Sequence, residues 1–154
     1  MLKTTRRLIF SLVATTFLFA ATDPILGTWK TNNTKSKFNP GPGAKSVTTT
    51  YTQDGEWIVG KTVGISGDGS PFERTNRYKL DGQPYPYDGP SGPGKISLKK
   101  IDDFTTESEV QLDAGGTTTS RSVFSKDLKT RTQTVTGVNS KGQKLNHVIV
   151  SERQ

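Results

Sequence analysis

Arg74 is the residue whose position in the sequence first suggests a chemical role. It lies in a stretch of alternating character, in which Phe72, Asn76 and Tyr78 share its side. Because alternate side chains of a strand point to the same face, the aromatic residues predict an inward face that carries Arg74 with it. A guanidinium inside a fold is costly unless it is paired or solvated. We therefore expect Arg74 to bind the anionic head group of a ligand; the alternatives are an inward acid or solvent at the mouth.

Two further segments contribute candidates for the same interior. Phe104 begins a clean alternation in which it shares a face with Val110, among others. The segment of Trp57 is ambiguous, since the face that contains Trp57 also brings Lys61 inside. Pockets for small molecules are mostly apolar with a few polar anchors. The candidate ligand-binding residues are therefore Trp57, Phe72, Arg74, Asn76, Tyr78 and Phe104.

Residues suited to acid–base or metal chemistry are few. His147 is the only histidine and cysteine is absent, which excludes the usual zinc ligand sets. The aspartates that precede glycines are typical of turns and lack the spacing of a calcium loop. Glu107 and Glu109 could form a carboxylate pair for sugar hydrolysis, but the alternation places both outside. We predict no catalytic residue, no metal and no cofactor.

The elements that must position these residues are strands. Turn residues such as those of Asp54-Gly55 and Gly115-Gly116 recur at short, even intervals. The segments between them are rich in threonine, valine, isoleucine and tyrosine, which favour strands. Nine strands are predicted, near 25–30, 46–53, 56–65, 71–80, 95–101, 104–112, 117–125, 129–138 and 144–152, with a long loop at 84–93.

A meander of this length hides its edge strands best by closing on itself. We therefore predict an all-β fold: one small up-and-down antiparallel β-barrel of about eight to nine strands. No segment after residue 20 shows helical spacing, a domain boundary or an internal repeat. With no cysteine, the domain has no disulfides and depends on its core alone.

Residues 1–20 have the pattern of a signal peptide. Lys3, Arg6 and Arg7 precede an apolar run that ends in small residues at Ala20 and Ala21. The run is shorter than the roughly 20 apolar residues that a spanning helix requires. We expect cleavage after Ala20 or Ala21, a mature domain of residues 21–154 without an integral membrane segment, and a periplasmic or secreted location.

The charge of the chain argues against a nucleic-acid partner. The formal net charge is +7, but three of the 21 basic residues lie in the leader. The remaining lysines and arginines are spread along the sequence, whereas nucleic-acid-binding proteins gather them into a stripe or patch. A modest surplus of this kind favours solubility and specifies no polyanionic partner.

Gly27-Thr28-Trp29 resembles the Gly-x-Trp signature of lipocalins, in which the tryptophan closes the floor of the barrel. The stretches 23–30 and 36–42, with Ser125-Lys126-Asp127 and a final strand that ends at Glu152, are similar to uncharacterised secreted lipocalin-like proteins of soil bacteria such as Acidobacteria. The resemblance covers nearly the whole mature chain. It implies a calyx-like barrel and a late-strand arginine packed on Trp29, for which the candidates are Arg121, Arg131 and Arg153.

Three hypotheses for function follow. The favoured one is an exported protein that binds a small hydrophobic or amphipathic molecule inside the barrel. The second is an envelope or stress protein with a filled barrel, whose loop at 84–93 contacts a partner through Tyr85 and Tyr87. The third, less favoured, is a small barrel cyclase or isomerase that would use Arg74, Lys61 or His147.

Overall fold

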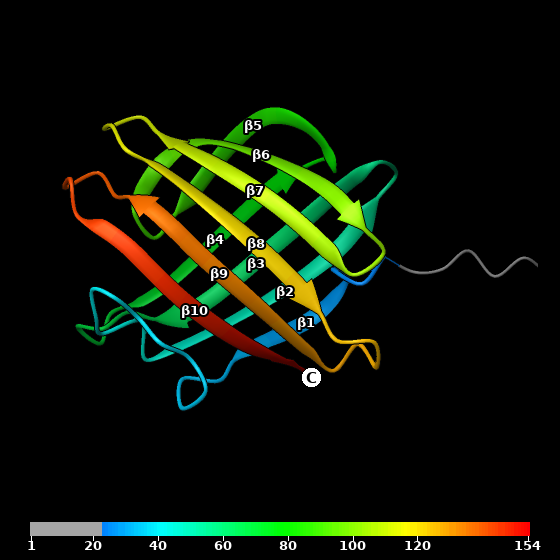
Figure 1. Ribbon diagram of the computed structural model, residues 1–154, viewed down its shortest axis with the longest axis horizontal. Coiled ribbons are helices and arrows are strands. Elements are labelled where there is room, and N and C mark those ends of the chain that lie inside the picture. Colours follow the sequence, from blue (N-terminus) through cyan, green and yellow to red (C-terminus); the bar gives the residue numbers. More distant parts are fainter. Residues whose placement is uncertain (1–22) are drawn as a thin grey trace, which may run out of the picture.

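Ten antiparallel strands form a single sheet that curls into a barrel in the computed structural model, which describes residues 23–154 (Figure 1). The predicted fold class is confirmed, with ten strands in place of eight or nine. These residues contain no helix with the length and hydropathy to cross a membrane. The predicted signal peptide lies outside the described residues. The strands are β1 (Gly27–Thr31), β2 (Ser46–Asp54), β3 (Trp57–Ile65), β4 (Pro71–Tyr78), β5 (Asp81–Gly89), β6 (Gly92–Asp102), β7 (Thr105–Leu112), β8 (Thr117–Phe124), β9 (Thr130–Val138) and β10 (Lys144–Arg153).

The sheet order is β4-β3-β2-β1-β10-β9-β8-β7-β6-β5, so almost every strand pairs with its neighbours in sequence. The exception is the pairing of β1 with β10, in which Trp29 lies opposite Arg153. β4 and β5 are consecutive but are not neighbours in the hydrogen-bonded order. Instead, the Asn76 side chain donates to the Asp88 carbonyl and accepts from the Asp88 amide, both at 2.8 Å. A side chain therefore replaces the backbone ladder where the barrel meets its own edge.

The strand β5 replaces the long loop predicted at 84–93, and that prediction is wrong. Pro84 and Pro86 suggested a loop because proline lacks the amide that a ladder requires. Both residues pair with β6, opposite Ser97 and Lys95. β5 is the last strand of the sheet. Proline is tolerated on such an edge strand because the missing amide can face the side on which no strand pairs.

One end of the barrel is closed by Trp29, which is 1% exposed. Its indole donates to the Ile25 carbonyl at 2.9 Å, and its ring packs on Phe124. The guanidinium of Arg153 lies 4.4 Å from the centre of the indole. A side chain at Gly27 would collide with Arg153. The glycine and the tryptophan of the Gly-x-Trp motif are thus both required by one arginine, and among the three candidates Arg153 is the one stacked closest on Trp29.

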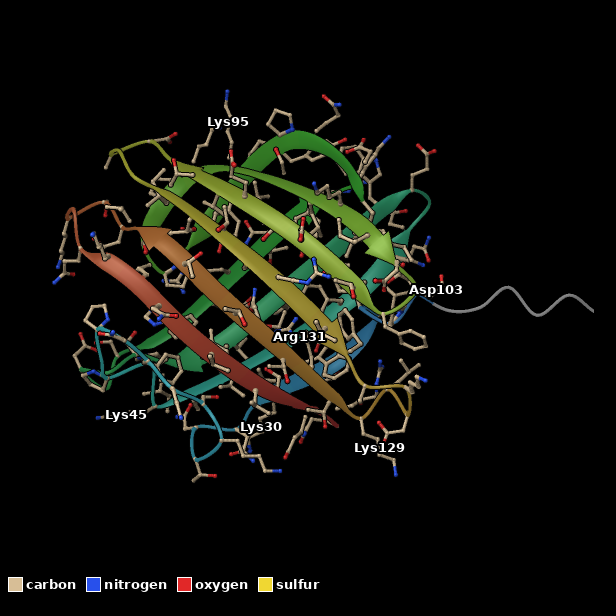
Figure 2. All side chains as sticks on the ribbon, viewed as in Figure 1. Lys30, Lys45, Lys95, Asp103, Lys129 and Arg131 are labelled. Carbon is tan, nitrogen blue, oxygen red and sulfur yellow. The ribbon has the colours of Figure 1, made fainter. Side chains whose placement is uncertain are left out.

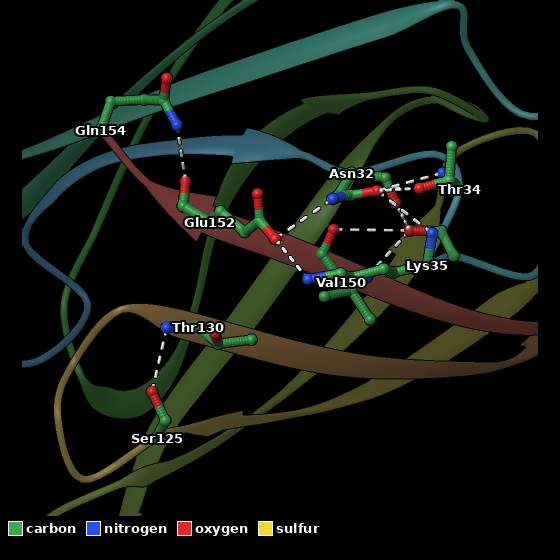
Figure 3. A network of polar contacts seen from close by, with 9 residues as sticks. Asn32, Thr34, Lys35, Ser125, Thr130, Val150, Glu152 and Gln154 are labelled. Carbon is green, nitrogen blue, oxygen red and sulfur yellow. Dashed lines mark hydrogen bonds and ion pairs between the residues drawn. The ribbon is translucent and has the colours of Figure 1, made fainter.

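The other end of the barrel is crossed by residues 32–45, which we call the strap. Its first turn is fixed to β10 because Glu152 accepts hydrogen bonds from Asn32 and Lys35, at 3.1 and 2.8 Å (Figure 3). Lys37 then makes an isolated bridge with Val148. The strap then continues alongside β10, where the Asn146 amide donates to the Asn39 carbonyl, and its Phe38 and Pro42 line the cavity.

Candidate ligand-binding site

The barrel encloses a cavity of about 540 Å³ that opens beneath the strap. This volume lies within the range of roughly 300–1,000 Å³ that small-molecule sites occupy. The inward side chains of the strands form its wall, and Trp29 and Phe124 form its floor. At the mouth lie Phe38 and Pro42 of the strap and Pro90 of the turn between β5 and β6. The described residues therefore provide a container with one closed end.

Four of the six predicted site residues line this cavity. Phe72, Arg74, Asn76 and Tyr78 all project inward from β4, as their alternation predicts. Tyr78 lies deep and is 5% exposed, whereas Phe72 and Arg74 are nearer the mouth. Whether these residues contact a ligand stays a prediction, but their shared face is as expected.

Trp57 and Phe104 do not line the cavity, and their predicted inward position is wrong. The inward face of β3 is the narrow one that begins with Ile58, and Trp57 lies outside. There its indole packs against Tyr85 and, at 4.5 Å, the guanidinium of Arg77. Phe104 lies in the turn before β7 and is 36% exposed. The turn interrupts the alternation, so Phe104 does not share the direction of the strand that follows.

Arg74 has the acidic partner that the alternative reading proposed. Its Nε lies 3.9 Å from a carboxylate oxygen of Asp88, and its guanidinium stacks 4.5 Å from the centre of the Phe72 ring. The side chain is 23% exposed, close to the mouth. Its charge is therefore partly compensated before any ligand arrives.

Arg131 is the cation that lacks such compensation. It projects from β9 into the cavity, close to the floor, and the residue is 8% exposed (Figure 2). Its Nη1 donates to the Tyr51 hydroxyl at 3.2 Å, and its guanidinium lies 5.8 Å from the centre of Trp29. Its Nε is buried without a hydrogen-bond partner. No carboxylate within residues 23–154 forms an ion pair with it.

Two phenol groups, those of Tyr51 and Tyr78, lie beside this guanidinium, and Tyr87 lies further along the cavity near Arg74. Burial, followed by the proximity of Tyr51, raises the pKa of Tyr78 well above its ordinary value. Burial also raises the pKa of Tyr87 to about 12. A side chain at Gly60 would come within 2.9 Å of the Tyr51 ring, so glycine leaves room for that ring beside Arg131. Arg131 is therefore surrounded by aromatic side chains, with no acid in contact.

No local sequence pattern singles out Arg131 for this role. In β9, threonines alternate with Arg131, Gln133 and Val135, and neither set is a strong apolar face. Among the sequence-based expectations, Arg131 is only a candidate partner for Trp29. Its pairing opposite Phe124 of β8 is the feature that turns it inward, and such a pairing is set by register and not by local pattern.

Solved structures with different names share this architecture; one of them is a protein of unknown function from Nostoc punctiforme, which matches with a TM-score of 0.57 and 14% identity, over 85% of this chain and 48% of that one. A Schistosoma mansoni fatty acid binding protein in complex with arachidonic acid matches with a TM-score of 0.63 and 18% identity, over 88% of this chain and 99% of that one. A zebrafish ileal bile acid-binding protein complexed with cholic acid matches with a TM-score of 0.55 and 12% identity, over 85% and 99%. The extracellular fatty acid binding protein As-p18 matches with a TM-score of 0.59 and 12% identity, over 86% and 97%. No protein-family model and no curated protein matches the sequence.

The fold is thus that of a calycin-like barrel, in which an antiparallel meander surrounds an internal cavity. At these identities the likeness concerns the fold, and the cavity must be understood from its own residues.

Proposed function

We propose that this chain is an exported protein that holds one small amphipathic molecule in the barrel, with an acidic head group against Arg131. The carrying observation is the buried Nε of Arg131, which has no hydrogen-bond partner and no acid beside it. An uncompensated buried charge costs several kcal/mol, and an anionic ligand would supply both the charge and the acceptors. The guanidinium presents paired donors that match a carboxylate.

Two further observations support this proposal. The lining of the cavity includes aromatic and aliphatic side chains, such as Phe72, Tyr87 and Ile149, which can pack against the apolar part of a ligand. The barrels of similar fold bind arachidonic acid and cholic acid, which are both amphipathic carboxylic acids. The basic, apolar leader and the resemblance to secreted lipocalin-like proteins support export to the periplasm or medium. The competing partner-binding hypothesis loses the loop on which it rested, since 84–93 contributes to β5 and β6.

The test compares palmitic acid with its methyl ester, using the mature domain and the fluorescence of Trp29 or calorimetry. Wild-type protein should bind the acid, and Arg131→Met should weaken that binding by 10-fold or more, because a charged hydrogen bond contributes about 1.5–3 kcal/mol. Binding of the ester should change by less than about 3-fold, since it carries no charge. Arg74→Met is the matched control, and its effect should be smaller because Asp88 already pairs with Arg74. If both ligands respond equally to Arg131→Met, or if neither binds the wild type, the proposal is wrong.

A further inference from the structure

One side of the cavity is lined by polar side chains and the other mainly by aromatic ones. This difference is not needed to bind a simple acid at Arg131. On β7, β8 and β9, six inward side chains carry hydroxyl or amide groups, and all but Thr118 lie towards Arg131. Those towards Arg131 form a continuous polar stripe made of Thr106, Ser108, Ser120, Ser122 and Gln133. On the facing strands, the aromatic side chains Tyr51, Phe72, Tyr78 and Tyr87 line the cavity.

Part of the polar stripe is linked by hydrogen bonds. Gln133 donates from its amide nitrogen to the Ser120 hydroxyl at 3.0 Å, and that hydroxyl lies 2.8 Å from the Ser108 hydroxyl. Whichever serine donates to the other, one O–H of the pair remains without an acceptor. No side-chain bond involving the Gln133 carbonyl oxygen or the Ser122 hydroxyl forms within residues 23–154. The stripe thus retains at least one donor and one acceptor that face the cavity.

The facing wall holds a single hydroxyl pair. Thr49 and Thr62 line the cavity, and their hydroxyls hydrogen-bond with each other at 3.0 Å, which also leaves one O–H of that pair free. Beside them, the ring of Tyr51 covers Gly60. A molecule held between the two walls therefore meets the polar stripe on one side. On the other side it meets mainly aromatic rings, because Arg74 and Asn76 are already joined to Asp88.

The position of the polar stripe sets a distance from the head group. Gln133 follows Arg131 by two residues on β9, and both point inward. A strand rises about 3.4 Å per residue, so the stripe begins roughly 7 Å from the guanidinium along the strand. Ser122 lies opposite Gln133 in the register of β8 and β9, at the same depth.

We infer that the ligand is an acid whose body carries oxygen functions along one side, close to the acid group, and is apolar along the other. This inference rests on the proposed function, because Arg131 fixes the direction of the molecule. A plain acyl chain would leave the polar stripe without partners, and unpaired polar groups disfavour a ligand that displaces their water. A hydroxylated acyl acid and a hydroxylated polycyclic acid share the required chemistry.

The experiment uses two pairs of ligands that differ by one hydroxyl near the acid. The acyl pair is 6-hydroxystearic acid and stearic acid; the polycyclic pair is deoxycholic acid and lithocholic acid, which differ at the 12-hydroxyl. Wild-type protein should bind the hydroxylated member of at least one pair about 10-fold more tightly, the equivalent of one good hydrogen bond. The pair that shows the preference identifies the source.

Variants then locate the preference in the polar stripe. The double variant Ser108→Ala with Ser120→Ala should reduce the ratio within the preferred pair to below about 3-fold, while binding of the plain acid is retained. The matched control is Thr119→Ala with Thr136→Ala, which removes a hydroxyl pair at 3.1 Å from the outer face of β8 and β9; it should leave the ratio unchanged.

The outcomes separate the two claims. Acids that bind through Arg131 with no preference in either pair, or with a preference that survives the double variant, overturn the inference and leave the proposed function in place. Failure of all four acids to bind, or binding that does not depend on Arg131, overturns both.

Discussion

Two arginines approach the same indole, and they have opposite roles. Arg153 donates from its three nitrogens to the carbonyls of Leu128, Leu26 and Pro24, at 2.6, 2.6 and 3.0 Å. Leu128 adopts a positive φ of 56° in the turn between β8 and β9. Arg131, on the cavity side, has a single hydrogen bond, to the Tyr51 hydroxyl. The first arginine fastens the closed end of the barrel, while the second keeps a buried Nε without a hydrogen-bond partner.

This contrast predicts opposite effects on stability. Arg153→Met should lower the free energy of unfolding by about 3 kcal/mol, because three bonds from a charged donor are lost. Arg131→Met should leave that free energy unchanged or raise it by up to about 3 kcal/mol, because replacing an uncompensated buried charge by an apolar side chain removes a desolvation cost. Urea unfolding of the ligand-free domain measures both.

The control for this comparison is Arg121→Met, which removes an outer-face ion pair with Glu107. Such exposed pairs contribute about 0–1 kcal/mol, so the control should differ little from the wild type. A destabilisation by Arg131→Met similar to that of Arg153→Met would show that Arg131 is a structural residue.

At the scale of elements, nine of the ten strands could be predicted because turn residues mark their ends and alternation marks their faces. β4 and β7 were clear in this sense, since their aromatic or aliphatic residues fall on one side. β5 was missed because Pro84 and Pro86 are tolerated only at an edge, and which strand is an edge depends on the closure of the whole sheet. The same limit hid Arg131, since β9 has threonines on one face and mixed residues on the other.

The strap is an element whose attachment should depend on pH. The Asn39 amide donates to Nδ1 of His147 at 3.0 Å, and the Phe38 ring packs against the imidazole. Burial lowers the pKa of His147. The folded state therefore favours the neutral imidazole, which accepts this bond; its contribution is complete above about pH 6.5, the ordinary value, and decreases as pH falls towards the lower folded-state pKa.

We expect hydrogen exchange at the Asn39 amide to accelerate relative to the rest of the strap as pH falls from 7 to 5, after correction for the intrinsic rate. His147→Asn is the matched variant, because its side-chain oxygen can occupy the position of Nδ1 and does not titrate. The variant should show no such acceleration. An equal acceleration in both proteins would rule out His147 as the cause.

At the scale of the molecule, the barrel has one seam, between β4 and β5. Every other junction is a backbone ladder, whereas this one depends on the two hydrogen bonds of Asn76 with Asp88 and on the Arg74–Asp88 pair. Strands with few ladder bonds open with a lower free energy than central ones. We therefore expect the barrel wall to open locally between β4 and β5 before it opens elsewhere.

Hydrogen exchange followed by mass spectrometry should show β4 and β5 exchanging before β8 and β9. Asn76→Ala should increase that difference, since it removes both bonds that span the seam. Thr119→Ala, on the outer face of β8, should leave the exchange of β4 and β5 unchanged. Uniform exchange over all ten strands would contradict the presence of a seam.

The pairing of β1 with β10 also has a topological consequence. Because the amide of Gln154 donates to the carbonyl of Thr28 and Arg153 reaches Pro24, residues at the two ends of the described chain are neighbours. A circularly permuted chain that joined these ends and opened at Leu80 would keep every strand pair, and each pair would then join consecutive strands. Such a chain has no long loop to close before its last ladder forms, and loop closure is the step that slows the folding of β-sheets. In the natural order of the strands, β1 and β10 form the one ladder between strands that are far apart in sequence. The entropic cost of closing a long loop therefore falls on this pairing, which lies beside Trp29.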